Sequence, residues 1–436
     1  MNDSATASVR EDTQARDRNR WYVLGVLTLV YSFNIADRYV VSTVLEPIRL
    51  ELQLSDSAIA FLTGVALALF YVTVGLPIAT FADRANRRNI IAVAVAVWSA
   101  MTALCGLAHN FWQLLVARFG VGIGEAGGTP PSTSMLADTF APRQRPMALT
   151  IFALGAPIGA WIGSQLAGYF ADTWTWRAAF IALGVPGFVL ALVVGFTLRE
   201  PSRGRFEGTT TRSAHADLSA TLRWMFRHRS ALHIILGGTI ATLWGWGLVW
   251  WTPAFLARIY GLTSGQAGTL LGPIHLLGGT VATLVTGWLV AQPFADDSRR
   301  IAWLLAGVVL LATIPSTVAY CTHDRNVAIV CLWMVIPAIY FFIGPTLGML
   351  QNVFPPDMRA QAVAVLLFTA NVANLIIAPQ LVGFASDYLA PSLGSHGESL
   401  RRALIVLSLT GAWGAWHFYR SARTLREDEA STSAAA

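Results

Sequence analysis

The sequence contains no lysine and few charged residues of any kind. All 30 basic residues among its 436 are arginines, and charged residues make up only 12% of the chain. Hydrophobic residues make up 55%, and the mean hydropathy is +0.54. A composition this apolar lies outside the range of soluble domains and is typical of integral membrane proteins.

Cysteine is also scarce. Cys105, Cys321 and Cys331 are odd in number and far apart, so they indicate neither a disulfide framework nor a metal cluster. No P-loop and no nucleophile–base pattern is present. We therefore expect no enzymatic activity, no cofactor, no metal and no nucleic-acid partner. Residues 1–20 lack the pattern of a signal peptide, so we expect the first apolar segment to be retained as a membrane anchor.

Apolar stretches of about 20 residues, the length of a helix that crosses a bilayer, recur along the chain. They predict twelve spans, near 20–44, 57–82, 89–108, 110–139, 145–170, 175–198, 231–257, 265–291, 300–320, 326–349, 358–388 and 399–420. We expect an all-α membrane protein with six-helix bundles at 20–198 and 231–420. A cytoplasmic linker at 199–230, with an amphipathic helix over Leu218–Arg229, joins them, and cytoplasmic tails occupy 1–19 and 421–436.

The arginines predict the orientation of the chain, because short cytoplasmic loops retain positive charge. If the N-terminus is inside, 22 of the 30 arginines fall in inside segments and six in outside segments. Both termini are therefore predicted to be cytoplasmic. We expect a multi-pass protein of the bacterial cytoplasmic (inner) membrane.

The two halves of the sequence resemble one another. The segment Gln165–Asp172, QLAGYFAD, and the segment Gln380–Asp387, QLVGFASD, agree at four of eight positions. Six-plus-six architecture with internal repeats is the signature of secondary transporters whose binding site lies between the halves near the midplane. The alternative is a duplicated bundle that transports nothing.

Four charged residues lie inside the predicted spans. Asp37, Arg38 and Arg118 are predicted at similar depth, and Glu125 lies two turns beyond Arg118 on nearly the same face. Intramembrane charges are costly unless they face a partner or a cavity. We expect Asp37 to pair with Arg118, and Arg38 with Glu125 or its neighbourhood. Burial raises the pKa of a carboxylate and a nearby arginine lowers it, so a moving arginine can switch proton binding. We therefore expect this cluster to couple transport to protons, with Glu125 as the first candidate for the titrating group and Asp37 as the second. The alternative is a static network that fixes helix packing.

Span four also reads Gly122-Ile-Gly-Glu-Ala-Gly127, which matches the dinucleotide fingerprint only in form, because it lies within a membrane span. Glycines at four-residue spacing, Gly120, Gly124 and Gly128, predict close helix contact instead. Pro130-Pro131 predicts a bend.

The substrate cavity is predicted from polar and aromatic residues in several spans. Span seven contains four tryptophans, Trp244, Trp246, Trp250 and Trp251, which form either an aromatic cavity wall or an anchor at the membrane interface. Of these, Trp244 and Trp246 are the candidates for the cavity. The remaining candidates are Tyr31, Asn34, His275, Thr369, Asn371 and Asn374. Charge in the first half facing an apolar and amide-lined surface in the second half suits an amphiphile with a polar head and an apolar tail.

The segment Ala79-Thr-Phe-Ala-Asp-Arg-Ala-Asn-Arg-Arg88 resembles the signature loop between helices two and three of the major facilitator superfamily. Asp83, Arg84, Arg87 and Arg88 match that signature, and Ala79 and Asn86 replace its glycines. Arg118 through Asp138 resembles the helix-four motif of the family. The resemblance implies a latch in which Asp83 sits against the start of span eleven and the arginines engage Asp138 or nearby carboxylates. For Arg87 and Arg88 the alternative is that they only enforce topology.

Within that superfamily the stretches NIADR, ADRANRR, RFGVGIGEA and FPPDMRAQAVAV are similar to spinster-type transporters. This implies a proton-coupled transporter of lysophospholipids or sphingolipid-like molecules that works by alternating access. Alternatives are a proton-coupled symporter of a small organic anion, a proton/drug antiporter, and a lipid sensor or scaffold without transport. We expect a monomer whose partners are substrate, protons and membrane lipids.

Overall fold

The computed structural model describes residues 3–69, 73, 78, 85–203 and 218–435, and within them the chain is helical and contains no strand. The helices are α1 Asp3–Thr43, α2 Leu45–Glu51, α3 Asp56–Ala60, α5 Arg87–Cys105, α6 Phe111–Glu125, α7 Thr129–Thr139, α8 Arg145–Ala153, α9 Gly155–Thr173, α10 Trp176–Thr197, α11 Leu218–Arg227, α12 Arg229–Tyr260, α13 Ser264–Pro273, α14 Thr280–Val290, α15 Ser298–Cys321, α16 Arg325–Phe341, α17 Ile343–Val353, α18 Arg359–Asn371, α19 Ala378–Leu393 and α20 His396–Ala435.

Within the described residues, eight helical segments are long and apolar enough to cross a membrane. Several consist of two labelled helices joined by a wider helical turn, such as η3 at Ile274–Gly279 between α13 and α14 and η5 at Val372–Ile377 between α18 and α19. The second predicted span, 57–82, begins as α3 and η1 and continues into residues that the structure does not describe. The fold is all-α, and the helices are consistent with twelve spans.

The fourth predicted span is broken rather than bent. Helix α6 ends at Glu125, and α7 begins at Thr129 with Pro130 and Pro131 in its first turn. Proline lacks the N–H that an interior helical position must donate, but the first turn of a helix does not need that donor. The two prolines therefore start a second helix.

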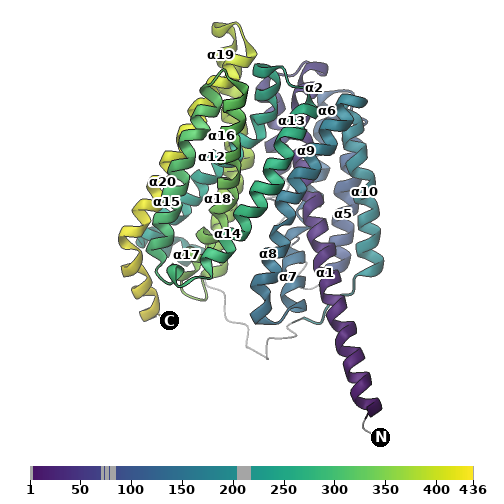
Figure 1. Cartoon of the computed structure of the whole chain (residues 1–436), viewed down its shortest axis with the longest axis vertical. Coiled ribbons are helices and arrows are strands. Elements are labelled where there is room, and N and C mark those ends of the chain that lie inside the picture. Colours follow the sequence, from purple (N-terminus) through teal and green to yellow (C-terminus); the bar gives the residue numbers. More distant parts are fainter. Residues whose placement is uncertain (1–2, 70–72, 74–77, 79–84, 204–217, 436) are drawn as a thin grey trace.

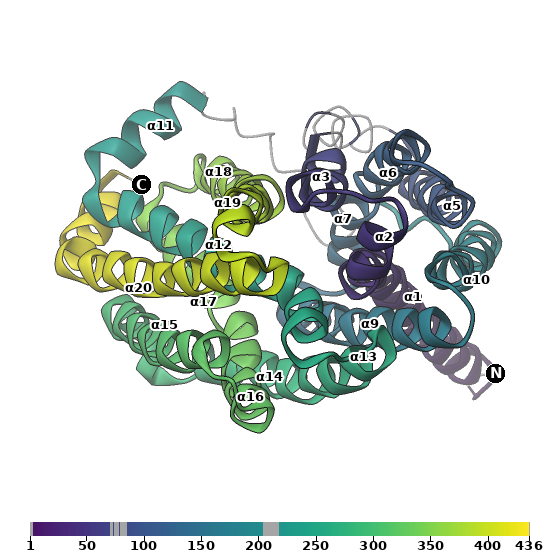
Figure 2. The same ribbon diagram turned by 90° about the horizontal axis from the view of Figure 1, so that it is seen from above.

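Two groups of helices lie side by side when the molecule is seen from above (Figure 2). The first helical group comprises α1–α10, in which α1 packs on α9 and α5 packs on α6 and α10. The second helical group comprises α11–α20, in which α20 packs on α12 and α15. Both chain termini lie at one end of the molecule, called here the terminal end (Figure 1). The opposite end carries α2 and the starts of α6 and α13.

Glycine permits the closest approach within the first helical group. A Cβ atom at Gly159 of α9 would lie 2.2 Å from the backbone oxygen of Ser32 of α1, and one at Gly163 would lie 2.4 Å from that of Ala36. No side chain fits in that space, so glycine fixes how near α1 lies to α9.

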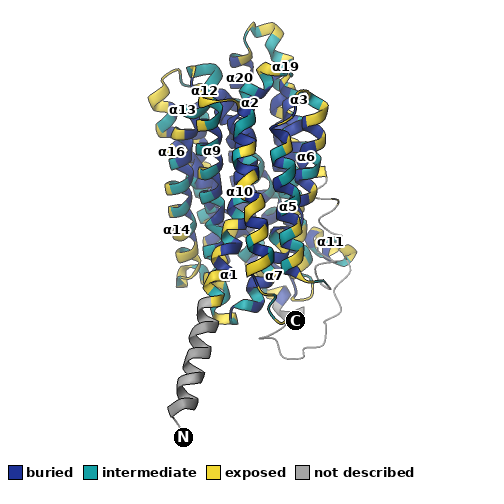
Figure 3. Cartoon of the chain, turned by 90° about the vertical axis from the view of Figure 1, so that its right-hand side faces the viewer, coloured by how far each residue is buried: buried dark blue, intermediate teal, exposed yellow. Residues whose placement is uncertain are grey.

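Exposed residues recur along the outward faces of the helices and alternate with buried residues on the same helices (Figure 3). Large apolar side chains are exposed in both groups, including Phe196, Trp288 and Val406. Apolar exposure this extensive marks a surface that something other than water covers. In a chain with membrane-crossing helices, that cover is lipid.

Candidate functional site

Two buried ion pairs join α1 to α6. Nη1 of Arg118 lies 2.8 Å from Oδ2 of Asp37, and both side chains are 2% exposed or less. The hydroxyl of Thr102 donates a hydrogen bond to the other oxygen, Oδ1, of Asp37. Each oxygen of this carboxylate therefore accepts a hydrogen bond, which is the condition for burying such a charge.

The second pair is arranged differently. Arg38 donates from Nε at 3.0 Å and from Nη2 at 2.7 Å, both to Oε2 of Glu125. The second oxygen, Oε1, is fully buried and accepts no hydrogen bond from any residue that the structure describes. An unsatisfied buried oxygen of this kind is rare and calls for an explanation. The structure thus contains both pairings that depth along the spans predicts, and it leaves one open acceptor, on Glu125.

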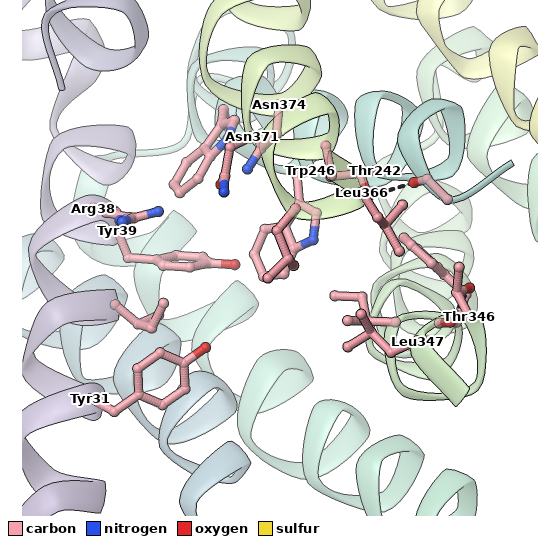
Figure 4. Close-up of a pocket in the computed structure, with 17 residues that line it drawn as sticks. Tyr31, Arg38, Tyr39, Thr242, Trp246, Thr346, Leu347, Leu366, Asn371 and Asn374 are labelled. Carbon is pink, nitrogen blue, oxygen red and sulfur yellow. Dashed lines mark hydrogen bonds between the residues drawn. The ribbon is translucent and has the colours of Figure 1, made fainter. Parts of the chain in front are cut away.

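A cavity of about 240 Å³ lies between the two helical groups (Figure 4). Tyr31, Arg38 and Tyr39 of α1 form one side of it, and Trp246 projects into its centre from α12. Its other residues are Ile35, Gly238, Thr242, Trp250, Phe342, Ile343, Thr346, Leu347, Leu366, Leu367, Ala370, Asn371 and Asn374. Arg38 is its charged residue, and its side chain is 13% exposed. The same guanidinium therefore contacts the cavity and Glu125.

Four of the eight predicted cavity residues line this cavity: Tyr31, Trp246, Asn371 and Asn374. Nε1 of Trp250, a residue outside that prediction, donates to Oδ1 of Asn374 at 2.7 Å. Trp250 and Thr242 lie four residues to either side of Trp246, on the same face of α12. That four-residue spacing could have predicted Thr242 and could have favoured Trp250 over Trp244 among the tryptophans of this span.

The other four predicted cavity residues do not line it. Trp244 is fully buried and donates to Ser316, because its position two residues before Trp246 turns it away. The hydroxyl of Thr369 is hydrogen-bonded to that of Thr239. The remaining two lie outside the cavity lining. His275 is buried, and its Nδ1 lies 3.0 Å from the hydroxyl of Tyr340. Asn34 borders a separate small space beside Trp98.

Three of the predicted latch residues, Arg87, Arg88 and Asp138, lie within the described part of the chain. Nη1 of Arg87 lies 2.6 Å from Oδ2 of Asp138, and its Nε lies 2.7 Å from Oε1 of Glu200. Arg87 and Asp138 belong to the first helical group, and Glu200 follows its last helix, α10. The Arg88 side chain donates to Asn89, and only its backbone N–H reaches Glu200, so the prediction that this guanidinium engages a carboxylate is corrected. Asp83 and Arg84 lie outside the described residues.

The opposite end contains an ion-pair network that the sequence did not suggest. Arg258 of α12 lies 2.7 Å from Oδ1 of Asp56 at the start of α3 and 2.7 Å from Oε2 of Glu46 in α2. The Asp56 carboxylate is fully buried and also accepts from Ser386 of α19 at 2.6 Å. We call Glu46, Asp56, Arg258 and Ser386 the bridge network, because it joins the first helical group to the second.

The internal repeat contributes equivalent contacts at this end. Asp387, the last residue of the second repeat, accepts hydrogen bonds from the backbone N–H groups of Asp56 at 2.9 Å and Ser57 at 2.8 Å. Asp172, the last residue of the first repeat, accepts from the hydroxyl of Thr263, the residue that caps α13. Each aspartate thus contacts the start of a helix in the other group, where an anion is favoured.

An all-α membrane chain with a cavity between two helical groups and an internal repeat on each side is the architecture of a secondary transporter. Comparison with known proteins agrees: the model of the Major Facilitator Superfamily matches residues 27–378, and the chain belongs to that family.

Individual relatives give more detail. An MFS-type efflux pump of Mycolicibacterium smegmatis is 31% identical, over 93% of this chain and 95% of that protein. A probable L-galactonate transporter of Escherichia coli is 27% identical, over 88% of this chain and 84% of that protein. A crystal structure of a bacterial homolog of the human lysosomal transporter Spinster, inward-facing and unoccupied, superimposes with a TM-score of 0.81 at 27% identity, covering 94% of this chain and 98% of that one. The chain is therefore a spinster-type member of the superfamily, and its relatives are transporters, not enzymes.

Proposed function

We propose that this chain is a proton-coupled secondary transporter that moves an amphiphilic molecule, such as a lysophospholipid or a sphingolipid-like molecule, by alternating access. The observation that carries the proposal is the double role of Arg38. This residue contacts the central cavity and donates two hydrogen bonds to Glu125, whose Oε1 has room for a proton.

The coupling follows from charge balance at Arg38. When Glu125 is ionised, its carboxylate holds the guanidinium, which is then less available to a substrate anion. When Oε1 binds a proton, the pair loses most of its attraction, because a neutral carboxyl group interacts weakly with a cation. Arg38 can then turn toward an anionic headgroup in the cavity. Asp37 has both oxygens satisfied and is assigned a supporting role that holds α1 against α6.

The conformational step uses the bridge network. With Arg258 bound to Asp56 and Glu46, the opposite end is held closed. We propose that residues 20–198 and 231–420 rock as two bundles, joined by the linker at 199–230, and that the bridge network parts when the opposite end opens. This assigns the state described here as inward-facing, with both termini in the cytoplasm and the chain a monomer in the bacterial inner membrane. The inward-facing spinster homolog supports the assignment.

The lining of the cavity supports an amphiphile. Arg38, Asn371 and Asn374 supply polar groups, and Trp246, Leu347 and Leu366 supply apolar surface. A site that encloses a drug-sized ligand occupies about 300–1,000 Å³, and this cavity is about 240 Å³. It therefore fits a headgroup and the first part of a tail, and the rest of the tail extends beyond it.

The second candidate is a symporter of a small organic anion, favoured by the single guanidinium in the cavity and by the name of the galactonate relative. Purified protein in liposomes separates the candidates when flux of a lysophospholipid, a sugar acid and a cationic dye is measured with and without a pH gradient. We expect gradient-dependent flux of the lysophospholipid. Flux of the sugar acid alone, without competition by lysophospholipid, supports the second candidate. Gradient-driven dye export indicates a drug antiporter, and binding without flux indicates a lipid sensor or scaffold.

A further inference from the structure

A second hollow lies on the outer surface of the second helical group, between α15 and α20, and shares no residue with the central cavity. It encloses about 530 Å³, within the range of sites for drug-sized ligands, roughly 300–1,000 Å³. Its lining residues are Trp303, Ala306, Gly307, Leu310, Ala412, Ala415, Trp416 and Tyr419. We call this hollow the lateral groove.

Helical spacing and small side chains create the groove. Trp303, Gly307 and Leu310 fall on one face of α15, at intervals of four and three residues, and α20 repeats these intervals. Around Gly307 a Cβ atom would meet nothing within 4 Å. Small residues thus form the floor of the groove, and large half-exposed rings form its walls. Its lining is apolar apart from the indole N–H groups and one phenol, so it suits a hydrocarbon chain.

Each aromatic wall carries a guanidinium. Arg299 lies 5.6 Å from the ring of Trp303, Arg420 lies 5.7 Å from that of Trp416, and Arg423 lies 5.3 Å from that of Tyr419. Helix α15 begins at Ser298 and α20 continues past Arg423, so all three arginines lie toward the terminal end of the groove. The groove therefore has an apolar body and a basic mouth.

The charge of that mouth is only partly balanced. Oδ1 of Asp297 lies 3.5 Å from Nε of Arg299, and its Oδ2 lies 2.7 Å from Nη2 of Arg426. Arg420 and Arg423 form no ion pair with any carboxylate in the described part of the chain. Guanidinium groups bind phosphate oxygens in a bidentate manner, and their stacking on the rings orients them for it.

We propose that the lateral groove binds an anionic phospholipid, with one acyl chain along Gly307 and the phosphate held by Arg299, Arg420 and Arg423. Basic pockets between membrane helices on the cytoplasmic side bind anionic headgroups for this reason. The lateral groove shares no lining residue with the central cavity, so lipid binding there is expected whatever substrate the central cavity transports.

The bound lipid has a structural consequence. The ring centroids of Trp416, on one wall, and His417 lie 4.7 Å apart. Nδ1 of His417 lies 2.8 Å from Nδ1 of His233 in α12. An occupied groove therefore supports the packing of α20 on α12, the helix that carries Trp246 into the cavity. Phosphatidylglycerol is expected to raise the thermal stability of the second helical group.

The test uses the full chain in detergent, titrated with phosphatidylglycerol or phosphatidylcholine and followed by native mass spectrometry and thermal unfolding. We expect phosphatidylglycerol to bind more tightly than phosphatidylcholine and to raise the midpoint of thermal unfolding more. The double variant Arg420→Gln/Arg423→Gln should weaken that binding about 25-fold, at roughly fivefold per arginine near an anionic headgroup. Arg402→Gln, on the same helix at the opposite end, removes one arginine charge away from the groove and should bind phosphatidylglycerol as the wild type does.

Filling the groove provides the second arm. Gly307→Trp should abolish the phosphatidylglycerol-dependent rise, whereas Gly25→Trp, at an exposed site on α1 that is equally open, should retain it. Equal binding of both lipids overturns the proposal, and so does unchanged phosphatidylglycerol binding in the arginine variant. Glu125→Gln should keep the lipid effect whether or not it transports, which separates this inference from the proposed function.

Discussion

The bridge network gives the sharpest single perturbation, Arg258→Met, which keeps the apolar stem of the side chain and removes its charge. Asp56 is fully buried and Arg258 is 5% exposed. Removing one partner of a buried ion pair costs about 3–5 kcal/mol, because the other charge is left without compensation. Ser386 and the more distant Arg49 remain near Asp56, which favours the lower figure.

A cost of about 3 kcal/mol lowers the ratio of molecules whose opposite end is closed to molecules whose opposite end is open by roughly 100-fold, since about 1.4 kcal/mol corresponds to tenfold. Ser42 reports this change. It is 3% exposed, and its hydroxyl donates to the backbone oxygen of Trp250 in the other helical group. Ser42→Cys in a Cys321→Ser background places a thiol at the closed interface, because the remaining native cysteines are buried.

The assay is the rate at which a membrane-impermeant maleimide, added from outside to oriented membranes, labels that thiol. We expect Arg258→Met to raise the rate by up to roughly 100-fold, the factor set by the same 3 kcal/mol. Arg177→Met is the control, because Arg177 pairs at 2.6 Å with Glu51 at the same end but within the first helical group. Equal labelling of Arg258→Met and the control refutes the role assigned to the bridge network.

Three further predictions concern packing, the cavity and pH. Gly159→Val should destabilise the chain by more than about 3 kcal/mol in thermal or denaturant unfolding, since its Cβ would lie 2.2 Å from a backbone oxygen of α1, whereas Gly25→Val should be neutral. Asn374→Leu removes the acceptor of the half-buried Trp250 indole and should raise the substrate KM about tenfold. A thermal midpoint equal to that of the wild type would show that this rise does not come from a loss of stability. Burial raises the pKa of Glu51, but the hydrogen bonds from Arg177 and a neighbouring indole outweigh it and lower the pKa. The stability that the Glu51–Arg177 pair supplies is therefore present above the ordinary glutamate pKa of about 4.3 and is lost as the pH falls through the lowered pKa. The difference in thermal midpoint between wild type and Arg177→Met should shrink below about pH 4.

Much of the candidate site could be predicted from the depth at which charged residues lie along the predicted spans. Asp37 and Arg118 are predicted at similar depth in different spans, and the cost of an unpaired charge in hydrocarbon leaves few partners. The structure contains this ion pair. The fold was equally accessible, because spans of about 20 apolar residues fix the helices whatever their neighbours. Helix packing could be predicted only where glycine imposes it.

The residues that could not be predicted lie at interfaces between helices far apart in the sequence. Arg258 and Asp56 are 202 positions apart, and each looks like an ordinary charge at a span end. Trp244 and Trp246 look alike in the sequence, yet one faces the core and the other the cavity. Residue type predicted which side chains matter, and only the three-dimensional packing assigns their faces.

The central claim is that Glu125 carries the coupled proton. The direct measurement is flux of the transported molecule in liposomes containing wild-type protein, Glu125→Gln or the control Glu398→Gln, each with and without a pH gradient. Glu398 is a suitable control because its side chain is 42% exposed and pairs with Arg401 of the same helix. The account predicts that the gradient accelerates flux by wild type and control, and that Glu125→Gln still exchanges substrate at a rate independent of the gradient. Gradient-driven flux by Glu125→Gln equal to that of the wild type would contradict it.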